Sequence, residues 1–220
     1  MQPVGDGHSF VISGHWNTRI FTPGWVRQNL CEDPQSEVTL AISIDDPTAP
    51  QRLSFEGIHL FPHQARLDFK PEEPTLEVMI KCQRIARRAL TLLSHTPVTG
   101  FGINFSFKET QEPERVTNRF IHRDAESIDS NMYQLTSTVI QRSFRIQQDA
   151  KLNLSVSYDA NEVRLDFNYH TDAGNAVAAA EALVNDIVSR RHAATLNFIQ
   201  NVYQFEMDQP QNDQNQAANH

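Results

Sequence analysis

Two copies of the tetrapeptide Arg-Leu-Asp-Phe, at residues 66–69 and 164–167, place a guanidinium and a carboxylate two residues apart. On a strand, alternate side chains share a face, so the Arg and Asp of each copy could bind a polar small molecule in a cleft between two halves of the chain. The competing interpretation is an ordinary charge pair on a solvated sheet face. The candidate ligand-binding residues are Arg66, Asp68, Arg164, Asp166 and His15.

A second set of candidate residues lies on a long helix predicted over residues 75–93. Lys81, Arg84 and Arg88 are spaced i, i+3 and i+7, which places them on one side of the helix, and Arg87 flanks them. The corresponding helix of the second half carries acidic and amide residues instead. The stripe could dock an acidic partner, the acidic half of another copy or, as a third class of function, nucleic acid. The competing interpretation is the charged outer face that amphipathic helices normally have.

Two tryptophans, Trp16 and Trp25, lie around a short helix predicted after Thr22-Pro23. Tryptophan is enriched both in cores and at interfaces, so core packing and partner binding are both open. The candidate partner-binding residues are therefore Lys81, Arg84, Arg87, Arg88, Trp16 and Trp25.

The motifs of common catalytic sites are absent from the sequence. It contains no Walker pattern, no Gly-x-Gly-x-x-Gly fingerprint and no Gly-x-Ser-x-Gly elbow. The histidines are scattered, and no cysteine pair brackets one. Cys31 has acidic neighbours, which disfavour a thiolate, and Cys82 falls on the apolar side of its helix. We predict no catalytic residue, no cofactor and no metal, and an enzyme is the less favoured class.

The composition is that of an ordinary soluble globular protein, with 39% hydrophobic and 21% charged residues among 220. A net charge of −8 opposes non-specific attraction to nucleic acid or anionic membrane. No apolar run is long enough to span a membrane, and the first residues lack the pattern of a signal peptide. The two cysteines do not make a disulfide framework, so we predict free thiols in a reducing cytoplasm.

Hydrophobic periodicity predicts a similar order of elements in the two halves. In the first half we expect a short helix ending near Leu30, the long helix, and strands at residues 10–12, 38–44, 53–60, 65–69 and 98–107. In the second half we expect a weak short helix at 124–131, a long helix over 173–199, and strands at 133–144, 151–158 and 162–167. The pattern leaves residues 195–205 open between helix and strand.

This order predicts an α+β fold of two tandem related units, marked by the repeated tetrapeptide. Each unit would be an antiparallel sheet of about four strands packed by one long helix plus a short helix. The predicted bounds are 1–107 for the first unit, 108–117 for a polar connector, 118–207 for the second unit and 208–220 for a disordered tail.

The function predicted on these grounds is a bacterial-type, non-enzymatic interaction or scaffold protein. The edge strands of duplicated sheets must be covered, either by the other unit or by a second copy of the chain. We therefore expect a protein partner or a homo-oligomer, and no membrane. The two alternatives are a small-molecule binder or enzyme with its site between the units, and a nucleic-acid-contacting subunit that uses the basic stripe.

Overall fold

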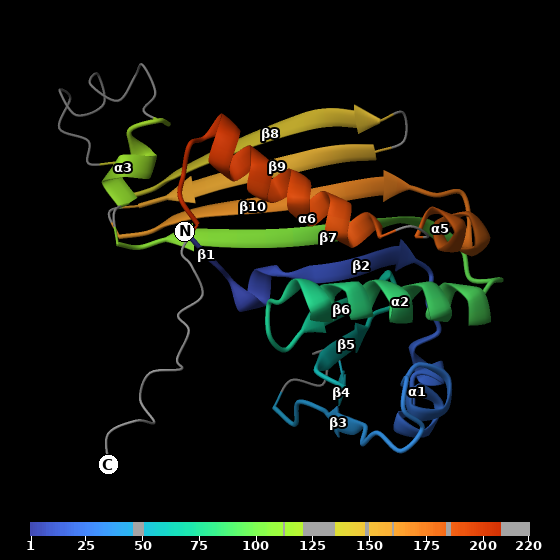
Figure 1. The fold of residues 1–220 in the computed structure, drawn as a ribbon. Helices are drawn as coiled ribbons and strands as arrows, with labels where there is room; N and C mark the ends of the chain where they lie inside the picture. Colours follow the sequence, from blue (N-terminus) through green and yellow to red (C-terminus); the bar gives the residue numbers. More distant parts are fainter. Residues whose placement is uncertain are drawn as a thin grey trace, which may run out of the picture.

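The computed structural model describes residues 1–45, 51–111, 113–120, 135–147, 150–159, 161–183 and 186–207. These residues form an α+β fold with one antiparallel sheet of ten strands (Figure 1). The strands are β1 (Gln2–Pro3), β2 (Ser9–Gly14), β3 (Thr39–Ala41), β4 (Arg52–Phe55), β5 (Ile58–Pro62), β6 (Arg66–Pro71), β7 (Val98–Glu109), β8 (Thr138–Gln147), β9 (Ala150–Tyr158) and β10 (Val163–Asp172).

The sheet runs without interruption in the order β3-β4-β5-β6-β2-β7-β10-β9-β8, and β1 pairs with β7. Both halves of the chain therefore contribute to one sheet, with β2 and β7 paired at its centre and β10 of the second half paired to β7. The helices are α1 (Pro23–Asn29), α2 (Leu76–Leu92), α3 (Pro113–Thr117), α5 (Ala176–Ala182) and α6 (Ile187–Asn197), with single helical turns η1 (Gly5–Gly7), η2 (Thr18–Ile20) and η3 (Phe198–Val202).

One face of the sheet carries α2 and α6, which lie side by side across it (Figure 1). We call this the helix face and the opposite side the open face. The side chains alternate between them as the period of a strand requires. The predicted apolar face of β7 is confirmed, since its four large side chains are buried under the helices: Phe101, Ile103, Phe105 and Phe107. Leu67, Phe69, Leu165 and Phe167 of the repeated tetrapeptides belong to the same core.

The starts of the helices follow from local chemistry. Thr75 caps α2, because its hydroxyl accepts a hydrogen bond from the amide of Val78, and Thr22 caps α1 in the same way before Pro23. Both starts agree with the sequence prediction.

The long helix predicted over 173–199 is instead divided into α5 and α6. Asp186 has a φ of 49°, and an α-helix cannot continue through a residue in the left-handed region. Beyond Asn197 the chain stays helical as the π-helical turn η3, so the described residues from 195 to 202 are helix and not strand.

Two strand predictions in the first half are wrong in extent. The strand predicted over 53–60 is a hairpin, because Glu56 and Gly57 both have positive φ, 48° and 77°, and form the turn between β4 and β5. The strand predicted over 38–44 is reduced to the three residues of β3, which among the described strands pairs only with β4, and Ile42 and Ile44 are exposed. Alternation alone could not show that this segment lies at the end of the sheet.

The elements predicted for the second half of the chain agree with the structure only in part. β8, β9 and β10 match the three strands predicted for the second half, with shifted ends. The short helix predicted at 124–131 and the tail at 208–220 lie outside the described residues. Among the helices that the structure describes, none is long and apolar enough to cross a membrane.

Two histidines lie between the amino-terminal segment, the sheet and α6, with His8 buried and His192 half-buried. The Nδ1–H of His8 donates to the carbonyl of Val4 at 2.9 Å, and the ring lies edge-on to Phe105 and Phe107. The His192 ring also lies edge-on to Phe105, with the ring centroids 5.4 Å apart. Burial lowers the pKa of both imidazoles below 6.5. Both are therefore neutral in the folded protein near neutral pH.

Acidification should destabilise the fold through this pair. Below pH 6.5 the unfolded chain binds protons that the folded chain does not, so the free energy of unfolding should fall until the lowered pKa values are reached. Urea unfolding at pH 7.5 and 5.5 should show a smaller pH effect for the double variant His8→Gln/His192→Gln than for the wild type. His95→Gln, at an exposed position, should retain the wild-type pH effect. Equal pH effects in all three proteins would contradict this assignment.

Candidate functional site

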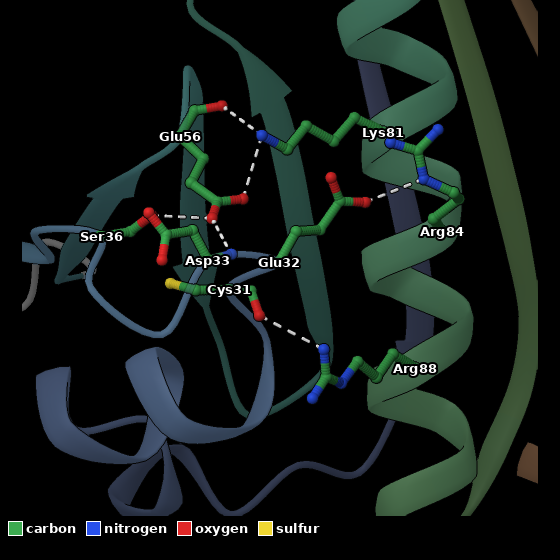
Figure 2. A network of polar contacts seen from close by, with 8 residues as sticks. All are labelled: Cys31, Glu32, Asp33, Ser36, Glu56, Lys81, Arg84 and Arg88. Carbon is green, nitrogen blue, oxygen red and sulfur yellow. Dashed lines mark hydrogen bonds and ion pairs between the residues drawn. The ribbon is translucent and has the colours of Figure 1, made fainter.

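The basic stripe of α2 lies against the chain that follows α1 and against the β4–β5 turn (Figure 2). The centre of the contact is the Glu56 carboxylate. It accepts hydrogen bonds from the Asp33 amide at 2.9 Å and the Ser36 hydroxyl at 2.8 Å, and it pairs with the Lys81 ammonium at 2.9 Å. The Glu56 side chain is only 8% exposed, so its charge is compensated almost entirely by groups of the same chain.

Two further residues of the stripe bind the same segment. Arg84 pairs with Glu32 at 2.9 Å, and Arg88 donates to the Cys31 carbonyl at 3.2 Å. Lys81 also donates to the Glu56 carbonyl at 3.2 Å. These three cations therefore hold the first half together and leave less charge for an acidic partner or nucleic acid.

The electrostatics of Glu56 follow from these contacts. Burial by itself would raise the pKa of the carboxyl group, but hydrogen bonds from the Asp33 amide, Lys81 and Ser36 hold the pKa at about 2. Glu56 also has a left-handed backbone, which is unfavourable for a residue with a side chain. The network thus fixes both the conformation and the charge of the turn.

Arg87, the remaining residue of the stripe, is exposed and points to a different neighbour. It lines a cleft of about 360 Å³ between α2 and α5. The cleft is also lined by Leu90, Thr91, Ser94, Val177, Ala180 and Glu181. Arg87 therefore lines a cleft beside α5, whereas Lys81, Arg84 and Arg88 bind the chain after α1 and the β4–β5 turn.

The two tryptophans are part of the packing around α1. Trp16 is buried, and its ring centroid lies 6.3 Å from that of Phe21. Trp25 packs edge-on against the other side of Phe21 at 5.4 Å and is partly buried. The structure therefore gives both side chains a place in the core, and only Trp25 keeps some exposed surface.

The Arg-Leu-Asp-Phe copies form charge pairs on the open face, and each pair lies within one strand instead of across two. Arg66 binds Asp68 at 2.9 Å, and Arg164 binds Asp166 at the same distance. The environments differ, because Asp68 is only 7% exposed while Asp166 is more exposed and accepts a hydrogen bond from Ser106. The expectation of a solvated pair therefore fails for Asp68.

These pairs are not brought into one site. β6 and β10 are separated by β2 and β7, which puts the two copies about 14 Å apart across the sheet at ordinary strand spacing. The fifth candidate, His15, is exposed and lines a shallow cleft with Trp16 and Asn17 at the end of β2. The residues proposed for ligand binding are thus dispersed over the open face and its border.

A row of hydrogen-bonded side chains crosses five strands of the open face. Ser143 donates to Asn153, Asn153 to Asn168, Asn168 to Asn104 and Asn104 to Ser9, over distances of 2.6–3.0 Å. Each donor and acceptor are direct partners in the sheet register. No local pattern in the sequence indicates this row, because it depends on the register of five strands. The side-chain amides of this row therefore find their hydrogen-bond partners within the protein itself.

The outer edges of the sheet differ strongly in length. β3 closes one end with three residues, whereas β8 closes the other with ten. Within the described residues, β8 pairs only with β9. Several large apolar side chains on and beside it are exposed, among them Val139 at 61%, Leu135 and Ile146. Figure 1 shows β8 as the uppermost strand, at the end of the sheet away from α2.

The described part of the chain contains neither a cluster of metal ligands nor an exposed, reactive thiol. No group of three or more His, Cys, Asp or Glu side chains there could hold a metal ion. His59 and His63 are four residues apart, but they lie on a strand and its turn, where this spacing does not bring side chains together as it does on a helix. Cys31 and Cys82 are both free and buried, and burial raises the pKa of each thiol, that of Cys82 to about 12.

Comparison with known proteins gives no further assignment, since no known protein family and no curated protein matches the chain. Within the described residues, the arrangement that remains is a sheet with one covered face, one internally bonded polar face and one long edge without a paired strand. The candidate functional site is therefore the β8 edge.

Proposed function

We propose that this protein is a non-enzymatic interaction or scaffold component that binds protein through the β8 edge, in an oligomer or a larger complex. The observation that carries the proposal is a ten-residue strand at the end of the sheet, with strand pairing on one side only among the described residues. A strand in this position presents backbone N–H and C=O groups that can pair with another chain.

The contrast with the rest of the surface supports this choice. The opposite edge is shortened to three residues, a common way in which proteins prevent unwanted pairing. On the open face, many polar side chains already bind one another within the chain. They do so in the hydrogen-bonded row from Ser143 to Ser9 and in the two Arg–Asp pairs. Three of the four cations of α2 are engaged by Glu56, Glu32 and the Cys31 carbonyl, namely Lys81, Arg84 and Arg88.

As part of the same proposal, the chain consists of two related units. Support comes from the strand order, which reads β2-β6-β5-β4 outward from the centre on one side and β7-β10-β9-β8 on the other. This grouping counts β7 with the second unit, whereas the predicted bounds of 1–107 place it in the first. The repeated tetrapeptides occupy equivalent strands, β6 and β10, and Ser9 and Asn104 face one another at the centre. In this arrangement β8 corresponds to β4, which β3 covers, so the second unit lacks a covering strand at that position within the described residues.

We also place the protein in a reducing cytoplasm, on the basis of its cysteines. Cys31 and Cys82 are unpaired with one another and buried, in a chain that forms its core without a cross-link. Labelling of the intact protein with a thiol reagent should reach neither cysteine until the chain is unfolded.

Charges on the β8 edge should abolish the complex. The double variant Val139→Lys/Gln141→Lys places lysines at two exposed positions of the edge, where they oppose strand pairing but leave the core untouched. Native-mass measurement of the protein purified from its host should show loss of the complex in this variant, with unchanged circular dichroism.

The matched control is Thr39→Lys/Ala41→Lys, which places two lysines on the short opposite edge. It should keep the mass of the wild-type complex. A complex that survives the β8 substitutions, or that both variants lose equally, would overturn the assignment of function to this edge.

A further inference from the structure

We infer that the partner at this edge is a second copy of the chain, paired antiparallel through β8 about a twofold axis with Gln141 opposite Gln141. The inference rests on the proposed function and specifies its partner and its register. A homodimer of this kind is isologous, so the same strand must be complementary to itself. Three properties of β8 decide whether it is: its straight length, its charges and the residues on each face.

The straight part of the strand limits the register. β8 follows β9 in continuous register from Thr138 to Arg145, and the register shifts between Arg145 and Gln147. A bulge bends a strand and disrupts regular pairing. Two copies therefore share the greatest length of regular strand when the twofold axis passes near the middle of residues 138–145, at Gln141 or Arg142.

Charge decides between these two positions. An axis at Arg142 would place that guanidinium directly opposite its own copy, and like charges directly opposite one another destabilise a strand pair. An axis at Gln141 moves each Arg142 opposite Ile140 of the other copy, whose apolar side chain can pack against the aliphatic part of the arginine. Both registers pair the same length of straight strand, and the Gln141 register is the one that avoids direct repulsion between like charges.

The facing residues suit each other on both sides of the sheet. On the helix face, Thr138 would lie opposite Phe144, a partly buried ring. On the open face, Val139 would lie opposite Ser143, and the two Gln141 amides can donate to and accept from one another. Because the axis is perpendicular to the sheet, the helices of both copies would cover the same face of one continuous sheet.

Single cysteines on the open face of β8 test the register directly. In the purified protein, Gln141→Cys should form a covalent dimer of the 25.1 kDa chain with a short bismaleimide or an oxidant. Val139→Cys and Ser143→Cys should each react poorly alone, because each lies about 13 Å from its own copy in this register at the usual rise of a strand. An equal mixture of these two variants should cross-link efficiently.

The wild-type protein controls for Cys31 and Cys82, and Asn153→Cys, on the neighbouring strand, controls for chance collision. Strongest self-linking at position 143 or 139 would overturn the Gln141 register. A monomeric mass with no cross-linking at any β8 position would overturn the second copy as partner. The proposed function would survive that last result if Val139→Lys/Gln141→Lys still removed a complex in the host, and would fail with it if no complex formed there.

Discussion

Replacing Gln83 with leucine should lower the free energy of unfolding by about 2–4 kcal/mol, because it leaves two buried backbone groups without partners. The Gln83 amide lies on α2 and reaches across to the break between α5 and α6. Its Nε2 donates to the Leu183 carbonyl at 2.8 Å, and its Oε1 accepts from the Val188 amide at 3.1 Å. Leucine has a similar volume, so the loss would report the two hydrogen bonds more than a cavity.

Urea unfolding measures the change in stability, and hydrogen exchange locates it. The Val188 amide should exchange faster in Gln83→Leu, since it lies at the start of α6 and its partner is removed. Arg87→Gln, on the exposed side of the same helix, should change stability by no more than about 0.5 kcal/mol. If Gln83→Leu were as stable as this control, the α5–α6 break would need another source of support.

Replacing Glu56 with glutamine should cost about 2–3 kcal/mol at pH 7, because Lys81 would lose the charge that balances it in a mostly buried position. The glutamine keeps the shape of the side chain, but its neutral oxygen is a weaker acceptor for the Asp33 amide and the Ser36 hydroxyl. The control is Glu32→Gln, which breaks the exposed pair with Arg84 and should cost less than about 1 kcal/mol.

The pH dependence of this cost follows from the lowered pKa. The carboxyl of Glu56 ionises at about 2 in the folded protein and near 4.5 when unfolded. The stability that its charge provides is therefore complete above pH 4.5 and is lost as the pH falls towards 2. Urea unfolding of the wild type and Glu56→Gln should differ most at pH 6–7 and converge in acid. A difference that stayed constant down to pH 3 would show that hydrogen-bond geometry, and not charge, is responsible.

Glu56 also shows where sequence reasoning reaches its limit. The turn residues Glu56-Gly57 are a local signal for a hairpin. The prediction of one continuous strand over residues 53–60 did not take this signal into account. The role of Glu56 as an acceptor for Lys81 and for the segment after α1 had no local signal at all. It arises because a hairpin, a loop and a helix meet at one place.

The candidate site divides in the same way. Helical periodicity placed Lys81, Arg84 and Arg88 on one side of α2, and the structure agrees, but their partners on the same chain came only from packing. The β8 edge was not singled out, since nothing in the residues of a strand states whether a neighbour lies on one side or on both. The row from Ser143 to Ser9 likewise exists only once five strands are in register.

The sequence by itself determined the properties that depend on neighbours along the chain. These are the alternation that buries Leu67 and Phe69, the capped start of α2 and the α+β class. The tertiary structure alone decided that the halves share one sheet through the pairing of β7 with β10, that the second long helix breaks at Asp186, and that β8 ends the sheet. The physical reason is that strand order and register are set by contacts between distant segments, whose energies no local pattern contains.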